Sequence, residues 1–204
     1  MKIFCIGRNY ADHAHELGNA VPEAPVFFLK PSTALVFTDR PIQLPTDMGP
    51  IHHELELVVA FDTYAKDIPV AMAPGMIASF TLGLDLTARV VQQELKEKGL
   101  PWEKAKAFDG SAVLGDVHLP MTSATELQGL RLKLMRNGEV VQEGDTRDMV
   151  HSVAELVHHV SHYITIEPGD LLFTGTPAGV GPIAPGDVLE GLLNDKRMLH
   201  ARFA

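Results

Sequence analysis

Proline and glycine interrupt this chain so often that a bundle of long helices is excluded. The sequence carries 17 glycines and 14 prolines, spread along the chain rather than gathered in one linker. These residues end helices and mark turns, so they favour many short strands. The dipeptide Asn137-Gly138, between two apolar segments, is the strongest short-range signal of a β-hairpin.

Hydrophobic periodicity predicts the elements between these turns. We expect helices over residues 11–17, 74–80, 88–98 and 153–164. The expected strands cover residues 2–7, 26–29, 34–37, 54–61, 81–87, 130–136, 139–143, 170–174, 187–192 and 198–203. Because the helices fall irregularly among the strands, the pattern favours an α+β fold over a regular βαβ repeat. A length of 204 residues suits a single domain over residues 1–204.

The composition narrows the class of partner. Hydrophobic residues make up 46% and charged residues 21%, the balance of a soluble globular domain. The formal net charge is -9. An acidic surface repels phosphate backbones and anionic lipid, so we expect neither nucleic acid nor membrane as a partner. An anionic substrate would need a local positive charge to receive it.

The single cysteine and the start of the chain bear on location. Cys5 lies in an apolar run that is typical of a buried strand, and one cysteine cannot form an intrachain disulfide. This usage suits a reducing compartment. The apolar stretch after Met1-Lys2 is shorter than the core of a signal peptide, and no run approaches the ~20 residues that span a bilayer. We therefore expect a cytoplasmic protein.

The segment His53-Glu54-Leu55-Glu56-Leu57 places two carboxylates in a strand that enters the core. Residues two apart on a strand share a face, so Glu54 and Glu56 would lie side by side. A solvated strand face explains a lone Glu-x-Glu, but here the neighbours are apolar, where unpaired carboxylates are costly. Asp85 lies in a second apolar run, although it could equally cap the next helix. Together the three would offer the hard oxygen ligands that Mg²⁺ or Mn²⁺ prefers.

Other polar groups are candidates for binding and proton transfer. His13 and Glu16 are three residues apart and would share a helix face, as a proton-transfer pair or as an ordinary surface ion pair. The Gly/Pro-rich segment 168–181 could cradle a carboxylate with threonine hydroxyls and backbone N–H groups, or be a plain hairpin corner. Lys106 could meet an anionic substrate or be a solvated loop lysine.

Taken together, these stretches resemble the motifs of the fumarylacetoacetate hydrolase family, especially its short acylpyruvase and oxaloacetate decarboxylase branch. The similar stretches run from about residue 5 to about residue 190: GRNYADHAHELGN, FFLKPSTAL, HHELELVV, LGLDLTARVVQQELKEKGLPWEKAKAFDGSAVLG, RNGEVVQEGDTRDM and PGDLLFTGTPAGVGP. The resemblance implies a mixed β-roll with a few peripheral helices, and a homodimer.

The resemblance also implies roles for the acidic residues and the histidine. Glu54, Glu56 and Asp85 would hold Mg²⁺ or Mn²⁺. His13 and Glu16 would form the catalytic dyad, on a lid over bound substrate.

The remaining implied roles concern a small 2-oxo acid substrate. Lys106 would be a catalytic residue in contact with it, Arg8 and Gln92 would bind it through polar groups, and Thr176 would bind its carboxylate. The implied reaction is hydrolysis of the C3–C4 bond of an acylpyruvate, such as fumarylpyruvate, through a metal-held enolate.

Several alternatives use the same residues. Oxaloacetate decarboxylation or keto–enol tautomerisation would pass through the same enolate, and a related isomerase of aromatic degradation is a further possibility. The intact His13–Glu16 pair favours hydrolysis, because the pair could activate the attacking water. A non-catalytic metal-binding protein that kept the fold is the alternative from a different class.

Overall fold

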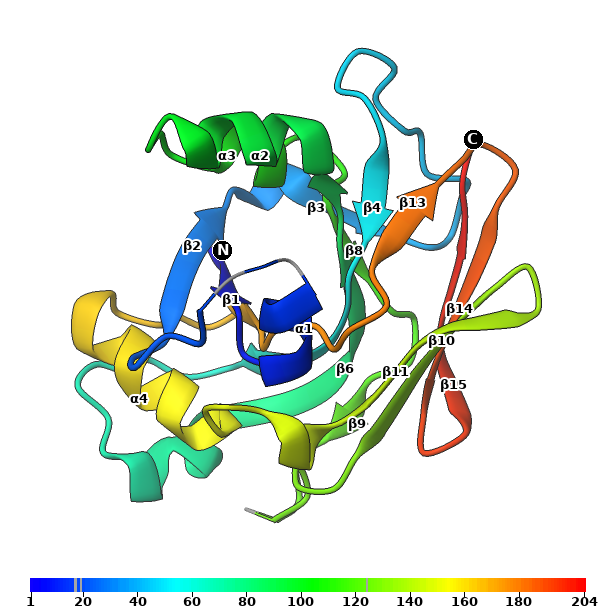
Figure 1. Ribbon diagram of the computed structural model, residues 1–204. Coiled ribbons are helices and arrows are strands. Elements are labelled where there is room, and N and C mark those ends of the chain that lie inside the picture. The colour runs from blue at the N-terminus through cyan, green and yellow to red at the C-terminus, as the bar shows by residue number, and fades with distance from the viewer. Residues whose placement is uncertain (17, 19, 124) are drawn as a thin grey trace.

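The computed structural model describes residues 1–16, 18, 20–123 and 125–204. Strands dominate the fold, and helices lie at its periphery (Figure 1). Within these ranges, no helix has the length and apolar character that a membrane crossing requires. The mixed, sheet-dominated α+β architecture expected from the sequence is confirmed.

A curled mixed sheet is the framework of the molecule (Figure 1). Its strands run in the order β2 (Val26–Lys30), β1 (Ile3–Gly7), β12 (Leu171–Phe173), β5 (Leu55–Phe61), β6 (Ile77–Asp85), β8 (Ala112–Leu114) and β3 (Leu35–Phe37), and β9 (Leu119–Pro120) pairs with β6. Strand β1 pairs with β12 in parallel, whereas β5 pairs with β12 and β6 in antiparallel fashion. Segments from opposite ends of the chain therefore meet beside β5.

Smaller sheets in the described part of the chain flank this framework. One runs in the order β11 (Glu139–Asp145), β10 (Arg131–Arg136), β14 (Val188–Leu193) and β15 (Lys196–Arg202), and another joins β13 (Gly181–Ile183), β4 (Ile51–His53) and β7 (Thr87–Ala88). Asn137 and Gly138 both have positive φ between β10 and β11. The predicted hairpin is thus confirmed, because such φ values are what its tight turn requires.

The helices lie between and beside the strands. They are α1 (Ala11–Glu16), α2 (Arg89–Glu97), α3 (Glu103–Lys106) and α4 (Val153–Tyr163), with 3₁₀ turns η1 (Ser32–Ala34), η2 (Val70–Met76) and η3 (Thr146–Asp148). Helix α4 begins with a capping box between Ser152 and Glu155. Helix α2 ends just before Gly99, whose φ of +63° stops the helix. Helices α2 and α3 lie together at one end of the curled sheet (Figure 1).

Strand β5 carries the polar residues of the site into the interior. Leu55, Leu57 and Val59 pack in the main hydrophobic core, while Val58 packs in a second apolar cluster. Side chains alternate along a strand, so Glu56 lies on the same side as Val58. The sheet therefore holds this carboxylate with only 1% of its surface exposed.

The prediction of a helix over residues 74–80 is wrong. The chain forms the 3₁₀ turn η2 there and enters β6 at Ile77. Pro74 lacks the backbone N–H that a continuing helix needs, and the apolar residues after it are taken up by the ladder with β5. The helix predicted over residues 11–17 is α1, and Leu17 lies outside the described residues.

Gly83, which faces Glu56 across the β5–β6 ladder, tests this packing. A Cβ atom at Gly83 would lie 2.6 Å from the ring of Phe173 and 2.8 Å from Val58. We expect Gly83→Ala to lower the free energy of unfolding by about 1–3 kcal/mol, measured by urea denaturation. Gly75→Ala is the control, since no atom would lie within 4 Å of its Cβ. Equal stability of the two variants would contradict this packing.

Candidate functional site

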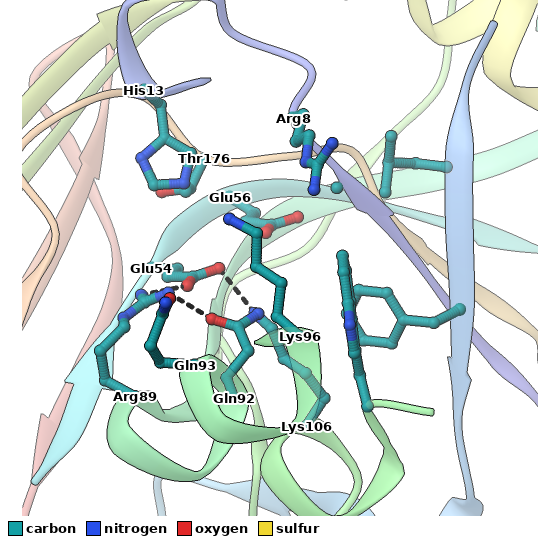
Figure 2. A pocket seen from close by; sticks show the side chains of 14 residues that line it. Arg8, His13, Glu54, Glu56, Arg89, Gln92, Gln93, Lys96, Lys106 and Thr176 are labelled. Atoms are coloured by element: carbon teal, nitrogen blue, oxygen red, sulfur yellow. Dashed lines mark hydrogen bonds and ion pairs between the residues drawn. The ribbon is translucent and has the colours of Figure 1, made fainter. Parts of the chain in front are cut away.

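A pocket opens where β1, β5 and α2 meet, with α1 at its border. Its volume is about 90 Å³. Figure 2 shows side chains from these separate elements directed into it. Seven of the nine predicted site residues line the pocket, namely Arg8, His13, Glu54, Glu56, Gln92, Lys106 and Thr176. Folding therefore brings together residues that lie far apart in the sequence.

The three predicted carboxylates form one buried cluster. Glu54, Glu56 and Asp85 each offer an oxygen within 4.8 Å of the other two. The backbone N–H of Asp85 donates to the carbonyl of Glu54 at 2.9 Å, which holds the end of β6 against the start of β5. Asp85 does not cap α2, because the N-cap position is Ala88. The two acidic stretches thus converge at one point beneath the pocket.

Cationic side chains pair with two of the three carboxylates. Lys106 Nζ lies 2.8 Å from both Glu54 Oε2 and Asp85 Oδ2. Arg89 Nη2 lies 2.5 Å from Glu54 Oε1, and Lys30 Nζ lies 2.7 Å from Asp85 Oδ1. Among the described residues, three cationic side chains therefore pair with Glu54 and Asp85, and none of these ion pairs involves Glu56.

Burial and neighbouring charge act on the cluster in opposite directions. Burial alone would raise the pKa of Glu54, but the charges of Lys106 and Arg89 hold it well below its usual value. Burial would lower the pKa of Lys106, yet Asp85 and Glu54 raise it, so Lys106 stays an ammonium. Burial and the charges of Asp85 and Glu54 raise the pKa of Glu56 well above its usual range. Glu56 is thus the member least compensated by positive charge.

The donor set fits a hard divalent cation. Three carboxylate oxygens suit Mg²⁺ or Mn²⁺, whereas zinc prefers His or Cys ligands. Asp85 Oδ1 is buried, with Lys30 Nζ 2.7 Å away as its ion-pair partner. The fit to a cation therefore rests on the donor set, three buried carboxylates with oxygens within 4.8 Å of one another. A cation there would replace the Lys106 ammonium between Glu54 and Asp85.

The loop after β12 supports Glu56 from another direction. The backbone N–H of Gly175 donates to Glu56 Oε2 at 2.7 Å. Gly175 has a φ of +100°, and a Cβ atom there would lie 2.7 Å from Asn9 Cβ. Glycine is needed both for this conformation and for the close approach. The loop geometry therefore fixes one oxygen of the carboxylate cluster.

His13 and Glu16 pair on α1 at the edge of the pocket. His13 Nδ1 lies 3.1 Å from Glu16 Oε2, and the imidazole is buried. Glu16 also accepts a hydrogen bond from the N–H of Gly179 at 3.1 Å, which ties α1 to the loop after β12. The contact with Glu16 leaves Nε2 as the ring nitrogen available to the pocket.

The remaining predicted residues lie on the pocket walls. Gln92 Oε1 accepts a hydrogen bond from Arg89 Nη1 at 2.7 Å. Thr176 lines the pocket together with His13, and the guanidinium of Arg8 points into the pocket (Figure 2). Arg8 has a φ of +61°, which is uncommon for a residue with a side chain. Such backbone strain is typical of functional sites.

Sequence reasoning missed two of the three cations that pair with the cluster, Arg89 and Lys30. Arg89 begins α2 and pairs with Glu54, 35 positions earlier in the chain, so no local spacing indicates the contact. Lys30 is fully buried and donates to the carbonyls of Lys106 and Ser111, contacts that no local pattern predicts.

The chain matches a family model. The model described as "Fumarylacetoacetate (FAA) hydrolase C-terminal" covers residues 2–201. The chain belongs to the fumarylacetoacetate hydrolase family. The resemblance drawn from the sequence motifs is thereby confirmed.

Relatives and solved structures agree with this membership. The Escherichia coli (strain K12) protein named oxaloacetate tautomerase YcgM is 44% identical over 189 residues, which cover 92% of this chain and 86% of that protein. A fumarylacetoacetate hydrolase family protein from Yersinia pestis CO92 superposes with a TM-score of 0.95 at 41% identity, covering 100% of this chain and 93% of that one. The fumarylpyruvate hydrolase from Pseudomonas aeruginosa, solved with Mn²⁺ and pyruvate, gives a TM-score of 0.90 at 36% identity, covering 100% and 89%.

These likenesses bear on the fold first. The β-roll with few helices, expected for a fumarylacetoacetate hydrolase family member, is confirmed by the close superposition. This fold places the carboxylate cluster, the His13–Glu16 pair and Thr176 around one pocket.

The Glu56→Gln substitution tests how much stability the protein loses by burying Glu56, the carboxylate of the cluster that is least compensated by positive charge. Folding raises the pKa of Glu56, so the folded state holds this proton more tightly than the unfolded chain. The metal-free protein must then lose stability as pH rises from the unfolded pKa through the raised folded one. Above that range, Glu56→Gln should raise the midpoint of thermal unfolding, because a neutral amide avoids the loss.

Addition of Mn²⁺ should reverse this difference, so that the wild type has a higher midpoint of thermal unfolding than Glu56→Gln. At a hundred times its dissociation constant, the ion should stabilise the wild type by about 2.7 kcal/mol and the variant much less. Glu103→Gln removes an exposed carboxylate and serves as the control. Its thermal midpoint and its response to Mn²⁺ should equal those of the wild type. Equal midpoints and equal Mn²⁺ responses for wild type and Glu56→Gln would refute this view of the cluster.

Proposed function

We propose that this protein interconverts the keto and enol forms of oxaloacetate, with Mg²⁺ or Mn²⁺ as its cofactor. The observation that carries the proposal is the 44% identity, over 92% of the chain, to a protein named oxaloacetate tautomerase. The site supports it through its charge, its size and its pair of proton-carrying residues.

The charge of the cluster suits a dicarboxylic 2-oxo acid. Three cations already pair with the carboxylate cluster, and Arg8 and Lys96 also line the pocket, so a bound divalent ion would make the pocket positive. Oxaloacetate, with two negative charges at neutral pH, suits such a pocket. A local positive charge of this kind also explains how a chain of net charge -9 could receive an anion.

The size of the pocket agrees with a small acid. Its volume of about 90 Å³ is well below the roughly 300–1,000 Å³ of pockets that hold drug-sized ligands. A four-carbon acid is at the small end of the 2-oxo acids that the family resemblance implies.

A cation held by Glu54, Glu56 and Asp85 would supply Lewis-acid stabilisation of the negative charge that develops on the C2 oxygen. The chain's own groups would bind and orient the substrate around it. The Thr176 hydroxyl would donate to the carboxylate, with Arg8 as a further cation on the pocket wall.

The neighbouring polar groups have distinct parts in this proposal. Lys106, held as an ammonium by its raised pKa, would contribute positive charge and would not act as a base. Gln92, fixed by Arg89, would present its amide N–H groups to the substrate.

His13 is the proposed proton carrier. The keto form carries on C3 the proton that the enol form carries on its C2 oxygen, so a base must take the proton from one atom while the other atom gains one. Glu16 holds the ring through Nδ1, and Gly179 holds Glu16 in turn. Nε2 is then free to exchange the C3 proton.

A second candidate is hydrolysis of an acylpyruvate such as fumarylpyruvate. The similarity to the fumarylpyruvate hydrolase solved with Mn²⁺ and pyruvate favours it. The His13–Glu16 pair would then activate water rather than move a C3 proton. Decarboxylation of oxaloacetate would need no attacking water, because the C4 group leaves as CO₂. The tautomerase ranks first because the identity to its namesake is higher, 44% against 36%. The homodimer and the cytoplasmic location stay predictions.

The direct test follows the enol absorbance of oxaloacetate with purified protein. We expect Mg²⁺ or Mn²⁺ to accelerate ketonisation, EDTA to abolish the acceleration, and added Mn²⁺ to restore it. Pyruvate release from oxaloacetate and from a panel of acylpyruvates is measured in parallel. Pyruvate release faster than tautomerisation would replace the proposal with one of its alternatives, and no turnover of any substrate would favour a non-catalytic protein.

His13→Asn tests the proton carrier. We expect kcat for ketonisation to fall by about 10²–10⁴-fold, because general acid–base catalysis contributes about that much. His15→Asn is the matched control, since His15 is exposed on the same helix. An equal, small effect of both substitutions would move the base to another residue.

A further inference from the structure

Gln142 lies behind the pocket and is not one of its lining residues. It comes from β11, in the flanking sheet, and only 2% of its surface is exposed. Its amide contacts two parts of the chain that supply site residues: the segment around Glu54 and the loop that carries Thr176. A buried amide that joins two walls of one site is in a position to set their geometry.

Backbone groups fix which way this amide points. Oε1 accepts a hydrogen bond from the N–H of Leu55 at 3.1 Å, and a backbone N–H can only donate. Nε2 donates to the carbonyl of Pro177 at 3.0 Å, and a carbonyl can only accept. If the amide were flipped, its NH₂ group would face the N–H of Leu55 and its oxygen would face the carbonyl of Pro177, and neither pair can form a hydrogen bond. The oxygen therefore faces β5 and the NH₂ group faces the loop.

This orientation fixes the tautomer of a neighbouring histidine. His53 Nδ1 lies 2.8 Å from Gln142 Oε1, so Nδ1 must carry the hydrogen. Burial lowers the pKa of His53, which keeps the imidazole neutral at neutral pH. With donors from both Leu55 and His53, the oxygen of the amide is fully engaged.

The same orientation fixes the role of the Thr176 hydroxyl. Gln142 Nε2 lies 2.9 Å from Thr176 Oγ1, so the hydroxyl oxygen accepts a hydrogen from the amide. The hydroxyl hydrogen has a poor alternative in the carbonyl of Pro177, 3.5 Å away. It is then available to donate into the pocket, which Thr176 lines (Figure 2).

We propose that Gln142 is a positioning residue that holds the Thr176 hydroxyl as a hydrogen-bond donor toward a carboxylate of the substrate. Gln142 acts only through Thr176 and does not touch the substrate. This inference rests on the proposed function, because it needs a carboxylate at Thr176.

A double-mutant cycle separates positioning from general stability. Gln142→Met keeps the size of the side chain and loses its hydrogen bonds, and Thr176→Val keeps the shape and loses the hydroxyl. Each should raise KM for oxaloacetate, and the dissociation constant of oxalate with Mn²⁺-loaded protein, by about tenfold or more, as for a hydrogen bond to a charged group. The double variant should bind oxalate no more weakly than Thr176→Val alone. Thr176→Ser, which keeps the hydroxyl group, should bind oxalate about as tightly as the wild type.

Ser161→Ala provides a control for stability alone. Ser161 is fully buried and hydrogen-bonded on α4, outside the residues that line the pocket. This variant should lower the thermal midpoint without changing KM. If Gln142→Met does not fold, the wild type supplies a second measurement. Oxalate should shift the side-chain amide resonance of Gln142 in ¹⁵N-labelled protein loaded with diamagnetic Mg²⁺, because the Thr176 hydroxyl hydrogen gains an acceptor.

The outcomes separate this inference from the proposed function. Additive losses in the double variant, or an unshifted Gln142 amide on oxalate binding, would overturn the inference alone while the wild type still converts oxaloacetate. A wild type that neither binds oxalate nor converts oxaloacetate would overturn both. Non-additive losses with rescue by Thr176→Ser would support positioning through the hydroxyl.

Discussion

The mutual repulsion of three buried carboxylates is the constraint around which this molecule is organised. Glu54, Glu56 and Asp85 lie within 4.8 Å of one another, where water cannot screen their charge. Lys106 and the other cations offset this repulsion for two of them, and Glu56 keeps a strongly raised pKa. A structure that retains such an arrangement sacrifices stability for function, as binding sites commonly do.

The curled sheet explains how a chain can hold this arrangement. Strands β5 and β6 set two of the acidic stretches side by side, and β12 ends in the loop whose Gly175 N–H holds Glu56. The flanking sheet adds Gln142, which ties that loop to β5. Glu56 is therefore held by a backbone N–H from the loop after β12, and Thr176 by a side-chain amide from the flanking sheet. A rigid site of this kind binds its ligands without first having to order itself.

Local sequence patterns could predict those helices, strands and turns whose conformation depends mainly on neighbouring residues. Alternation along residues 54–61 indicated a strand with its carboxylates on one side, and Gly99 marked the end of α2. Residues 74–80, the end of η2 and the start of β6, were predicted as a helix, because apolar spacing alone cannot tell a short helix from a strand in the core. The short strands β4, β9 and β13 escaped prediction for a related reason, since only pairing with remote strands defines them.

For the site, the motifs indicated the acidic residues, and the fold brings them together. What no motif indicated is their pairing in the folded chain: Lys106 donating to two carboxylates at once, Lys30 beside Asp85, and Gln142 reaching Thr176. These contacts join residues at least 20 positions apart, so they depend on the tertiary fold. The sequence could indicate the acidic residues of the site, but it could not indicate which cations pair with them.

Crystals grown with Mn²⁺ and measured at the manganese absorption edge test the central claim most directly. We expect an anomalous peak within coordination distance of oxygens of Glu54, Glu56 and Asp85. The Lys106 ammonium should no longer lie between Glu54 and Asp85. A map without a peak at this position, with Lys106 still bridging Glu54 and Asp85 at saturating Mn²⁺, would contradict it.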